Sequence, residues 1–250
     1  MGNYSHAEGY VSYAAGDYSH TEGFKVFATG QSSHAEGEKT LSSGRSSHAE
    51  GYGGWRSVGK IQQAQNSYSG VVTSGINLLH VGDYITISTN TYPSHASRIT
   101  DINYATNRIT FSKTITASNS ASTLYVYRGS SIGDYSHTEG CNCQAVGANS
   151  HSEGNSTIAR GDCSHTEGNS TLSSGANSHA EGYDTLATNE NSHAEGKSSW
   201  AANDSSHAEG KASIAYGIGS HSEGKGGLVN VLNTTINSYT GGSLEVSITS

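Results

Sequence analysis

Residues 178–191, SHAEGYDTLATNEN, contain the unit from which most of this 250-residue chain is built. The pentapeptide Ser-His-(Ala/Thr/Ser)-Glu-Gly occurs eleven times in the sequence. Its histidines are 14 residues apart, except that His137 follows His48 by 89 residues, which is 75 more than one repeat. All copies therefore share one register, and 75 residues are inserted between the fourth and fifth. Short repeats in register indicate a solenoid in which each repeat forms one coil.

Small residues recur at fixed positions when each repeat is numbered from its serine. Positions 1, 3 and 5 hold Ser, Ala/Thr/Ser and Gly, and positions 8, 10 and 12 hold mostly Ser/Thr, Ala/Ser and Gly/Asn. Side chains alternate along a strand, so each repeat predicts two short strands whose small faces pack together. The glycine spacing and the β-branched residues exclude helices. We expect an all-β fold, a parallel β-roll or β-helix of 14-residue coils with glycine-bearing turns.

The composition also favours a thin repeat fold over a globule with a large core. Apolar residues make up 32% of the chain, against roughly 45–50% in typical domains. No apolar run approaches the roughly 20 residues that span a bilayer, so we expect no membrane insertion. The three cysteines do not form the clusters typical of a disulfide framework or a zinc ribbon. A net charge of −8 without a basic stripe disfavours nucleic-acid binding.

The outer faces of the two strands form columns of equivalent side chains. Position 9 is bulky and apolar in ten of eleven repeats, and Gln144 is the exception. Such a ladder exceeds the apolar patch that monomers usually expose, so we expect sister subunits to cover it. This apolar column comprises Tyr13, Phe27, Leu41, Trp55, Ile158, Leu172, Leu186, Trp200, Ile214 and Leu228. The His and Glu columns, at positions 2 and 4, are also expected at the subunit interface and comprise His6, Glu8, His20, Glu22, His34, Glu36, His48, Glu50, His137, Glu139, His151, Glu153, His165, Glu167, His179, Glu181, His193, Glu195, His207, Glu209, His221 and Glu223.

Three chemistries are conceivable for the His and Glu columns. A Ser-His-Glu triad is disfavoured, because Ser5 and His6 point to opposite faces and a rod has no substrate pocket. His-x-Glu sequences from three chains around an axis could bind a first-row metal. A ladder of His–Glu hydrogen bonds is the favoured interpretation, since buried imidazoles and carboxylates regularly pair. We therefore assign no catalytic, metal-binding or cofactor-binding residue, and expect a histidine-linked response to acid.

The frame Ser-x-Ala-x-Gly-x-x-(Ser/Thr)-x-Ala-x-Gly resembles the head repeat of the YadA-type trimeric autotransporter adhesins, in which Val and Ile hold the places of His and Glu. The Ser-His-Ala-Glu-Gly version is similar to arrays in tail-fibre and appendage proteins of phages and prophages. The resemblance covers about two thirds of the chain. It implies a left-handed parallel β-roll, three chains side by side in a homotrimer, and a binding role at an exposed surface.

The insertion differs in character from the repeats. Residues 81–88, 97–103, 108–112 and 123–128 have the alternation of short strands, which favours a small β-barrel or β-sandwich. Tyrosine suits recognition surfaces, and the candidate ligand contacts are Tyr68, Tyr84, Tyr92 and Tyr104. The predicted organisation is repeats one to four in 1–60, the inserted module in 61–135, repeats five to eleven in 136–233, and the start of a second insertion-like or capping segment in 234–250.

These features favour a structural and adhesive function. We expect a homotrimeric segment of a phage tail fibre or appendage in the virion, which presents the inserted module to a glycan or protein receptor on the host surface. A trimeric adhesin of the bacterial cell surface is the alternative. A spike-borne glycan-degrading enzyme is less favoured, because no carboxylate pair stands out among the few acids of the insertion, which include Asp83 and Asp101. Residues 237–241 echo residues 66–70, so we expect a fragment of a longer fibre.

Overall fold

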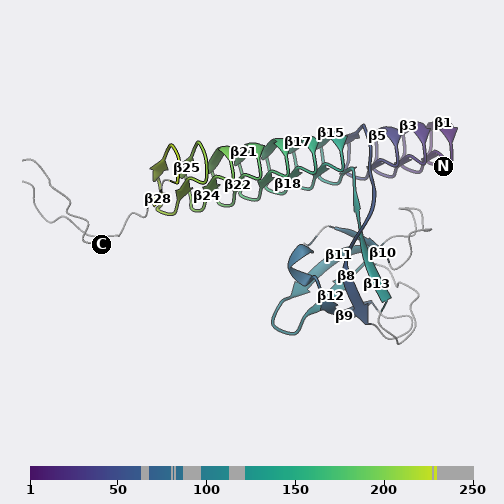
Figure 1. Ribbon diagram of the computed structural model, residues 1–250. Helices are drawn as coiled ribbons and strands as arrows, with labels where there is room; N and C mark the ends of the chain where they lie inside the picture. The colour runs from purple at the N-terminus through teal and green to yellow at the C-terminus, as the bar shows by residue number, and fades with distance from the viewer. Residues whose placement is uncertain are drawn as a thin grey trace, which may run out of the picture.

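The computed structural model describes residues 1–62, 68–79, 81, 83–86, 97–112, 122–226 and 228–229. These residues form an all-β rod with a six-stranded barrel beside it (Figure 1). The rod is a parallel β-solenoid with one coil per 14 residues, so the predicted fold class of the repeats is confirmed. The predicted segment 234–250 lies outside the described residues.

Each coil contributes one strand to each of two eleven-stranded parallel sheets. The first sheet contains β1 (His6–Tyr10), β3 (His20–Phe24), β5 (His34–Glu38), β7 (His48–Ala49), β15 (His137–Cys141), β17 (His151–Asn155), β19 (His165–Asn169), β21 (His179–Tyr183), β23 (His193–Lys197), β25 (His207–Ala208) and β27 (His221–Ser222). The second contains β2 (Tyr13–Ala14), β4 (Phe27–Ala28), β6 (Leu41–Ser42), β14 (Ser130–Ser131), β16 (Gln144–Ala145), β18 (Ile158–Ala159), β20 (Leu172–Ser173), β22 (Leu186–Ala187), β24 (Trp200–Ala201), β26 (Ile214–Ala215) and β28 (Leu228–Val229). The paired strand residues are equivalents in neighbouring coils, as His6 and His20 are.

The interior between the two sheets is filled by small side chains, as the parity of the repeat predicts. Ala35 and Ala194 at position 3, and Ala187 at position 10, are fully buried. Several buried hydroxyls find partners on the backbone of the same coil. The position 8 hydroxyl of Thr40, for example, donates to the Glu36 carbonyl oxygen at 2.8 Å. The thin interior is therefore filled mainly by Ala, Ser and Thr, and part of its hydroxyl groups are hydrogen-bonded within it.

In the turns of each coil, residues other than glycine also adopt the left-handed backbone conformation. Gly9 and its equivalents at position 5 have φ near 100°, as expected. Positions 7 and 14 also have positive φ although they hold other residues, such as Lys25 at 57° and Tyr18 at 59°. The prediction of glycine-bearing turns is therefore incomplete, because two of the three positive-φ positions of each coil mostly hold residues other than glycine.

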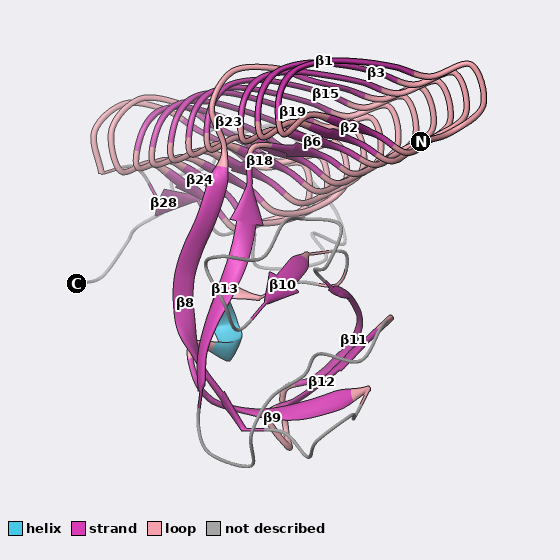
Figure 2. Ribbon diagram, turned by 90° about the vertical axis from the view of Figure 1, so that its right-hand side faces the viewer, coloured by secondary structure: helices cyan, strands magenta, loops and turns pink. Residues whose placement is uncertain are grey.

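The insertion begins and ends earlier along the chain than the sequence analysis predicts. The second strand of coil four is β14, which pairs with β6 on one side and β16 on the other. The insertion thus occupies residues 54–128 rather than 61–135, and coil four resumes at Gly129. The length of 75 residues is right, but the predicted position is wrong by seven residues at both ends. The antiparallel strands β8 and β13 connect the rod and the barrel: the chain enters the barrel along β8 and returns to the rod along β13 (Figure 2).

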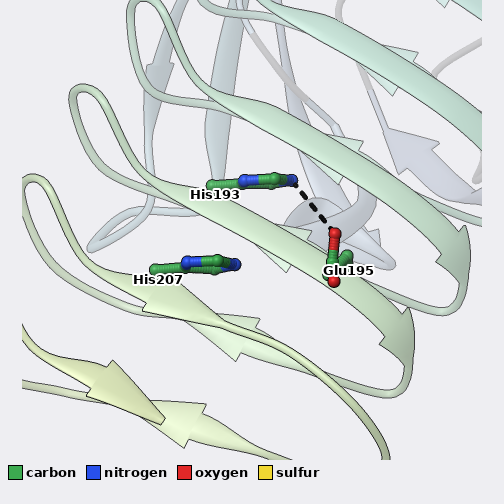
Figure 3. Close-up of side chains that lie close together, drawn as sticks. All are labelled: His193, Glu195 and His207. Carbon is green, nitrogen blue, oxygen red and sulfur yellow. Dashed lines mark ion pairs between the residues drawn. The ribbon is translucent and has the colours of Figure 1, made fainter. Parts of the chain in front are cut away.

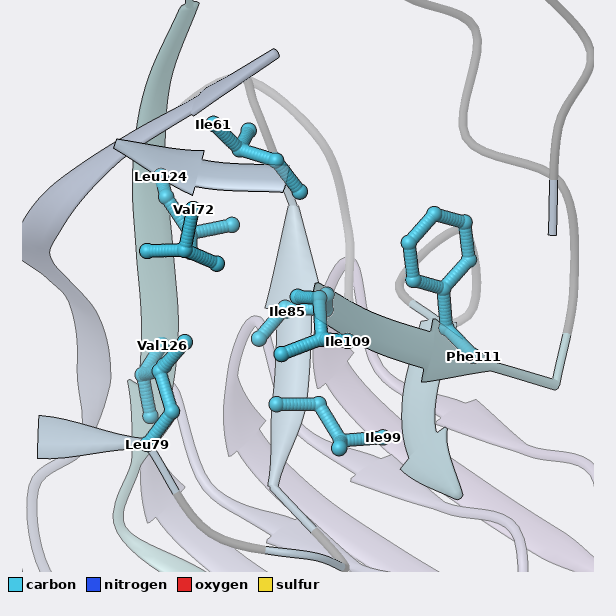
Figure 4. Close-up of a cluster of buried hydrophobic side chains, with 9 residues drawn as sticks. All are labelled: Ile61, Val72, Leu79, Ile85, Ile99, Ile109, Phe111, Leu124 and Val126. Atoms are coloured by element: carbon cyan, nitrogen blue, oxygen red, sulfur yellow. The ribbon is translucent and has the colours of Figure 1, made fainter. Parts of the chain in front are cut away.

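The barrel has the strand order β10-β11-β12-β9-β8-β13 and closes through the β10–β13 pair. Its elements are β8 (Gly54–Gln62), β9 (Ser69–Ser74), the 3-10 helix η1 (Ile76–Leu78), β10 (Tyr84–Thr86), β11 (Ser97–Asn103), β12 (Arg108–Phe111) and β13 (Ser122–Arg128). Its interior is a conventional apolar core that includes Ile61, Ile109 and Leu124 (Figure 4). Strands β8 and β9 were absent from the sequence-based prediction.

Candidate functional site

The eleven repeat histidines form one unbroken stack along the first sheet. Position 3 points inward, so the side chains at positions 2 and 4 point outward on the same face. Successive imidazole rings are 4.7–5.0 Å apart between centroids and lie within 19° of parallel. The side chains of the inner histidines remain about a third exposed, as His193 does at 37%. The strand register thus converts a sequence repeat into a continuous imidazole surface.

The glutamates form a parallel column beside the histidines. The nearest Nε2–carboxylate distances are 3.4–3.9 Å. His48 lies closest to Glu36 of the preceding coil, whereas His193 lies closest to Glu195 of its own coil. Figure 3 shows His193 Nε2 directed at Glu195, with the His207 ring parallel to that of His193. The structure therefore brings the predicted His and Glu residues together on one face.

The predicted hydrogen bonds between imidazole and carboxylate are not formed within the described part of the chain. In nine histidines the Nε2 atom is shielded from solvent and has no hydrogen-bond partner there. These are His20, His34, His48, His137, His151, His165, His179, His193 and His207. The favoured interpretation places each hydrogen bond on a carboxylate of the same or of the next chain; the version within one chain is not formed by these nine Nε2 atoms, and the version between chains stays a prediction. The nearest carboxylate oxygens lie 3.4–3.9 Å from Nε2, which is at or beyond the length of an ordinary hydrogen bond.

Close spacing also perturbs the ionisation of both columns. Burial lowers the pKa of His151 and His193, and repulsion from neighbouring imidazolium rings adds to this effect. The Glu139 carboxyl, together with burial, raises the pKa of Glu153 to about 7. Interaction with Glu153 in turn lowers the pKa of Glu139 and Glu167. The glutamates thus share protons instead of all being ionised near neutral pH.

The apolar column is divided by the barrel into two parts. Phe27 and Leu41 are buried against Tyr127 of β13, and Tyr84 packs on the same cluster. The expectation that sister subunits cover the whole column is therefore wrong for Phe27 and Leu41, because the chain's own barrel covers them. Two coils beyond Leu41, Gln144 Nε2 donates to Asp83 Oδ1 of the barrel at 3.2 Å. This contact with the barrel explains why a polar side chain is accommodated at Gln144.

Trp55 does not belong to the column that the sequence analysis assigned to it. It lies in β8, opposite Tyr127 of β13. Its place in the second sheet is taken by Ser130, which pairs with Leu41 and Gln144. The error arises because Gly53-Gly54-Trp55 imitates positions 7–9 of a normal repeat, where position 9 is bulky and apolar. Leu228 does pair with Ile214 in the sheet, but its side chain lies outside the described residues.

Beyond the barrel, the apolar column continues as a partly exposed row. Its members are Ile158, Leu172, Leu186, Trp200 and Ile214, which we call the apolar row. Trp200 Nε1 donates to Thr188 Oγ1 at 3.1 Å, so the ring is held in place on the surface. At the other end of the rod, Tyr13 is 41% exposed. The apolar row is the largest part of the column that the chain leaves uncovered.

The candidate tyrosines of the insertion differ in exposure. Tyr68 is 60% and Tyr104 is 56% exposed, and the Tyr104 hydroxyl donates to the Leu79 carbonyl oxygen at 3.3 Å. Tyr84 is partly buried at the junction with the solenoid. Tyr92 lies outside the described residues. The roles of these tyrosines as ligand contacts stay predictions, and Tyr68 and Tyr104 are the accessible ones.

The serine that opens each repeat has a structural role that the sequence analysis missed. Ser19 Oγ donates to the Gly16 carbonyl oxygen at 2.6 Å, and Ser150 Oγ donates to that of Gly147 at 2.7 Å. The same bond recurs at Ser33, Ser47, Ser136, Ser178 and Ser220. These hydroxyls are buried and close the turn before each first strand. The Ser/Gly spacing of three residues is the sequence signal that could have identified this turn.

Comparisons with known proteins identify no family for this chain. No protein-family model matches the sequence, and no curated protein matches it. A structural match is the crystal structure of the tailspike protein gp49 from Pseudomonas phage LKA1, with a TM-score of 0.22 and 11% identity. The alignment covers 82% of this chain and 32% of that chain, so this chain spans about a third of that protein's length. A similarity this low carries no functional argument. Among the described residues, no helix is long and apolar enough to cross a membrane.

Proposed function

We propose that this chain is a shaft segment of a homotrimeric phage tail fibre or appendage, which carries a receptor-binding barrel. The observation that carries the proposal is that a closed barrel stands beside an uninterrupted solenoid (Figure 1). A rod of identical coils positions its attachments rigidly, and insertions on such rods are frequent binding elements. The location that follows is the virion.

The apolar row supports the trimeric part of the proposal. Five consecutive coils, from Ile158 to Ile214, present a partly exposed apolar side chain at the same position. Burial of such a row contributes roughly 25 cal/mol for each Å² of apolar surface removed from water. Because the barrel occupies the second-sheet face at Phe27 and Leu41, sister chains would contact this face mainly beyond it. The His and Glu columns would lie against the neighbouring chains on the opposite face.

The barrel can be deleted while the 14-residue spacing of the solenoid is kept, so its proposed role in receptor binding can be tested. Gly53 and Gly129 are neighbours in space, since a Cβ added to Gly129 would lie 2.3 Å from the Gly53 Cα. Gly129 already belongs to the solenoid, because its amide donates to the Cys143 carbonyl oxygen at 2.9 Å. Deletion of residues 54–128 therefore joins adjacent backbone and restores the 14-residue spacing between His48 and the next repeat.

The experiment compares the intact chain and this deletion variant on a glycan array and on host-derived cell-wall fragments. We expect the intact chain to bind at least one ligand class and the deletion variant to lose that binding. Circular dichroism of the deletion variant checks that the solenoid is intact. Equal binding by both proteins, or no binding by either, would contradict the proposed role of the barrel.

A further inference from the structure

We propose that the His/Glu face of the solenoid is a row of binding sites for late first-row divalent cations, such as Ni²⁺, Co²⁺ or Zn²⁺. One group consists of His193, Glu195 and His207, whose nearest ligand atoms all lie within 4.8 Å of one another (Figure 3). Equivalent groups recur along the rod, some with two histidines and one glutamate, and others with two glutamates and one histidine. The sites follow from one chain alone and do not depend on the proposed trimer.

The donor set fits this class of cation better than the hard cations. Imidazole nitrogen suits zinc, copper and nickel, whereas magnesium and calcium prefer sites made entirely of oxygen ligands. Three protein ligands leave the remaining coordination positions to water. Bonds of about 2.0–2.2 Å require the ligand atoms to approach one another more closely than in the cation-free structure. The side chains can rotate to do so, because His193 and Glu195 are 37% and 34% exposed.

A second observation points to the same ligand. His179, His193 and His207 each have an Nε2 atom that is shielded from solvent and lacks a hydrogen-bond partner within the described residues. An unsatisfied buried acceptor or donor is costly, and a metal bond to a neutral imidazole removes the cost. Each Nε2 lies 3.8 Å from a carboxylate oxygen of its own coil, so both kinds of ligand are already adjacent.

The carboxylate column gains from cation binding as well. Like charges spaced by one coil repel, which a divalent cation between them offsets. Neighbouring groups share residues, since His207 belongs both to the group with His193 and to the group with His221. Two adjacent groups therefore cannot both be filled with the full ligand set. We expect more than one bound cation per chain, but fewer than the number of groups.

The test is a titration of the full-length chain with Ni²⁺ at pH 7.5, after removal of metals with EDTA. All proteins in the titration carry Cys141→Ser and Cys163→Ser, because accessible thiolates would otherwise compete for the cation. Excess Mg²⁺ is present throughout. We expect isothermal titration calorimetry to detect more than one bound Ni²⁺ per chain. Displacement of Ni²⁺ by Mg²⁺ would contradict a site that depends on imidazole.

Matched variants locate the sites on the ladder. The triple variant His179→Gln, His193→Gln and His207→Gln should lose at least one bound Ni²⁺ per chain. The control, Asp184→Asn, Glu190→Gln and Asp204→Asn, removes three exposed acids from the same coils but not from the ladder, and should bind as the parent does. Equal loss in both variants would show non-specific charge attraction and overturn the proposal.

A measurement on the parent chain covers the case in which the triple variant does not fold. Co²⁺ is paramagnetic, so binding should shift and broaden the imidazole proton resonances of the repeat histidines at substoichiometric amounts. Resonances of the barrel core, such as the methyl groups of Ile109, should be unaffected. Unchanged imidazole resonances at saturating Co²⁺ would overturn the proposal irrespective of any variant.

Discussion

The barrel and the solenoid of this chain are stabilised in opposite ways. The barrel encloses large apolar side chains, among them Ile85, Ile109 and Phe111. The solenoid encloses Ala, Ser and Thr, such as Ala194 and Thr157, between two sheets held by backbone hydrogen bonds. Among the described residues, the largest side chain in the apolar clusters of the solenoid interior is that of Val26, which packs with Ala28 and Ala35. The comparison shows that in-register repetition can replace a conventional core, because each coil satisfies the backbone groups of the next.

The two regions should therefore fail for opposite reasons. A core of large residues is sensitive to the loss of atoms, which leaves cavities. An interior of small residues in close contact is sensitive to the addition of atoms, which have no space. The following substitutions test this contrast, in order of decreasing expected effect.

The largest effect is expected from a single added methyl group in the solenoid, in Gly168→Ala. Gly168 has a φ of 103°, and a Cβ at this position would lie 2.2 Å from the Gly182 carbonyl oxygen. Backbone strain of about 1–3 kcal/mol and overpacking of about 1–3 kcal/mol predict a loss of about 4 kcal/mol. Chemical denaturation combined with hydrogen exchange should show loss of protection in the surrounding coils.

Gly219→Ala is the matched control for this substitution. Gly219 has a φ of 63°, but nothing lies within 4 Å of an added Cβ. Its position 14 holds residues with side chains in other coils, such as Asn191 at a φ of 54°. We expect a cost of about 1–2 kcal/mol, from the left-handed backbone alone. An equal effect of both substitutions would show that close approach between coils does not limit the solenoid.

Removal of atoms from the barrel core should have the next largest effect, in Ile109→Ala. Ile109 is fully buried in the cluster of Figure 4. Substitutions of this kind cost about 2–5 kcal/mol, through lost burial and a residual cavity. Hydrogen exchange should increase in the barrel strands but not in coils six to ten. Uniform destabilisation of the whole chain would contradict the separation of the two regions.

The junction between the regions is tested by Tyr127→Phe. The buried Tyr127 hydroxyl donates to the Lys39 carbonyl oxygen of the solenoid, and burial raises the pKa of this phenol so that it stays protonated. Loss of the hydrogen bond should cost about 1–2 kcal/mol and increase exchange in coil three. Tyr125→Phe, on the same strand, is the control and should have little effect. An unchanged exchange rate in the Tyr127 variant would show that this bond does not hold the barrel to the rod.

The smallest effect is expected from the glutamate column, as a dependence on pH. The pKa of Glu153 is about 7 in the folded chain and near 4.5 in the unfolded chain. As the pH rises through this interval, the unfolded chain loses the proton first, so the fold becomes less stable. In EDTA-containing buffer, Glu153→Gln should melt above the parent at pH 8 and level with it at pH 5. The difference should be within about 1 kcal/mol, as for other exposed charge interactions.

Glu167→Gln gives the opposite sign and serves as the control. The pKa of Glu167 is lowered by interaction with Glu153, so its ionised form stabilises the fold above the unfolded pKa. The variant should therefore melt below the parent at pH 8. Identical shifts in the two variants would show that the carboxyls titrate independently of one another.

The repeat made most of the solenoid predictable from the sequence. The 14-residue spacing, together with the parity of small residues, predicts two strands per coil, an inward Ala35 and an outward His34, as observed. It also predicts the length of the insertion, because the His48–His137 step exceeds one repeat by 75 residues. These predictions succeed because strand periodicity depends only on local alternation.

Contacts between distant segments could not be predicted in this way. Nothing local distinguishes Phe27 and Leu41, which the barrel covers, from Leu172, which it leaves partly exposed. The misplacement of Trp55 has the same origin, since only sheet pairing shows that Ser130 completes coil four. The orientation of the imidazole Nε2 atoms depends on ring stacking between coils, which a pattern of residue types does not specify.

The central claim is that sister chains cover the apolar row of Ile158, Leu172, Leu186, Trp200 and Ile214. Sedimentation equilibrium of the intact chain at micromolar concentration tests it most directly, beside a variant with Leu172→Ser, Leu186→Ser and Ile214→Ser. The account predicts a trimer for the intact chain and a folded monomer for the variant. A monodisperse, stable monomer of the intact chain would contradict it.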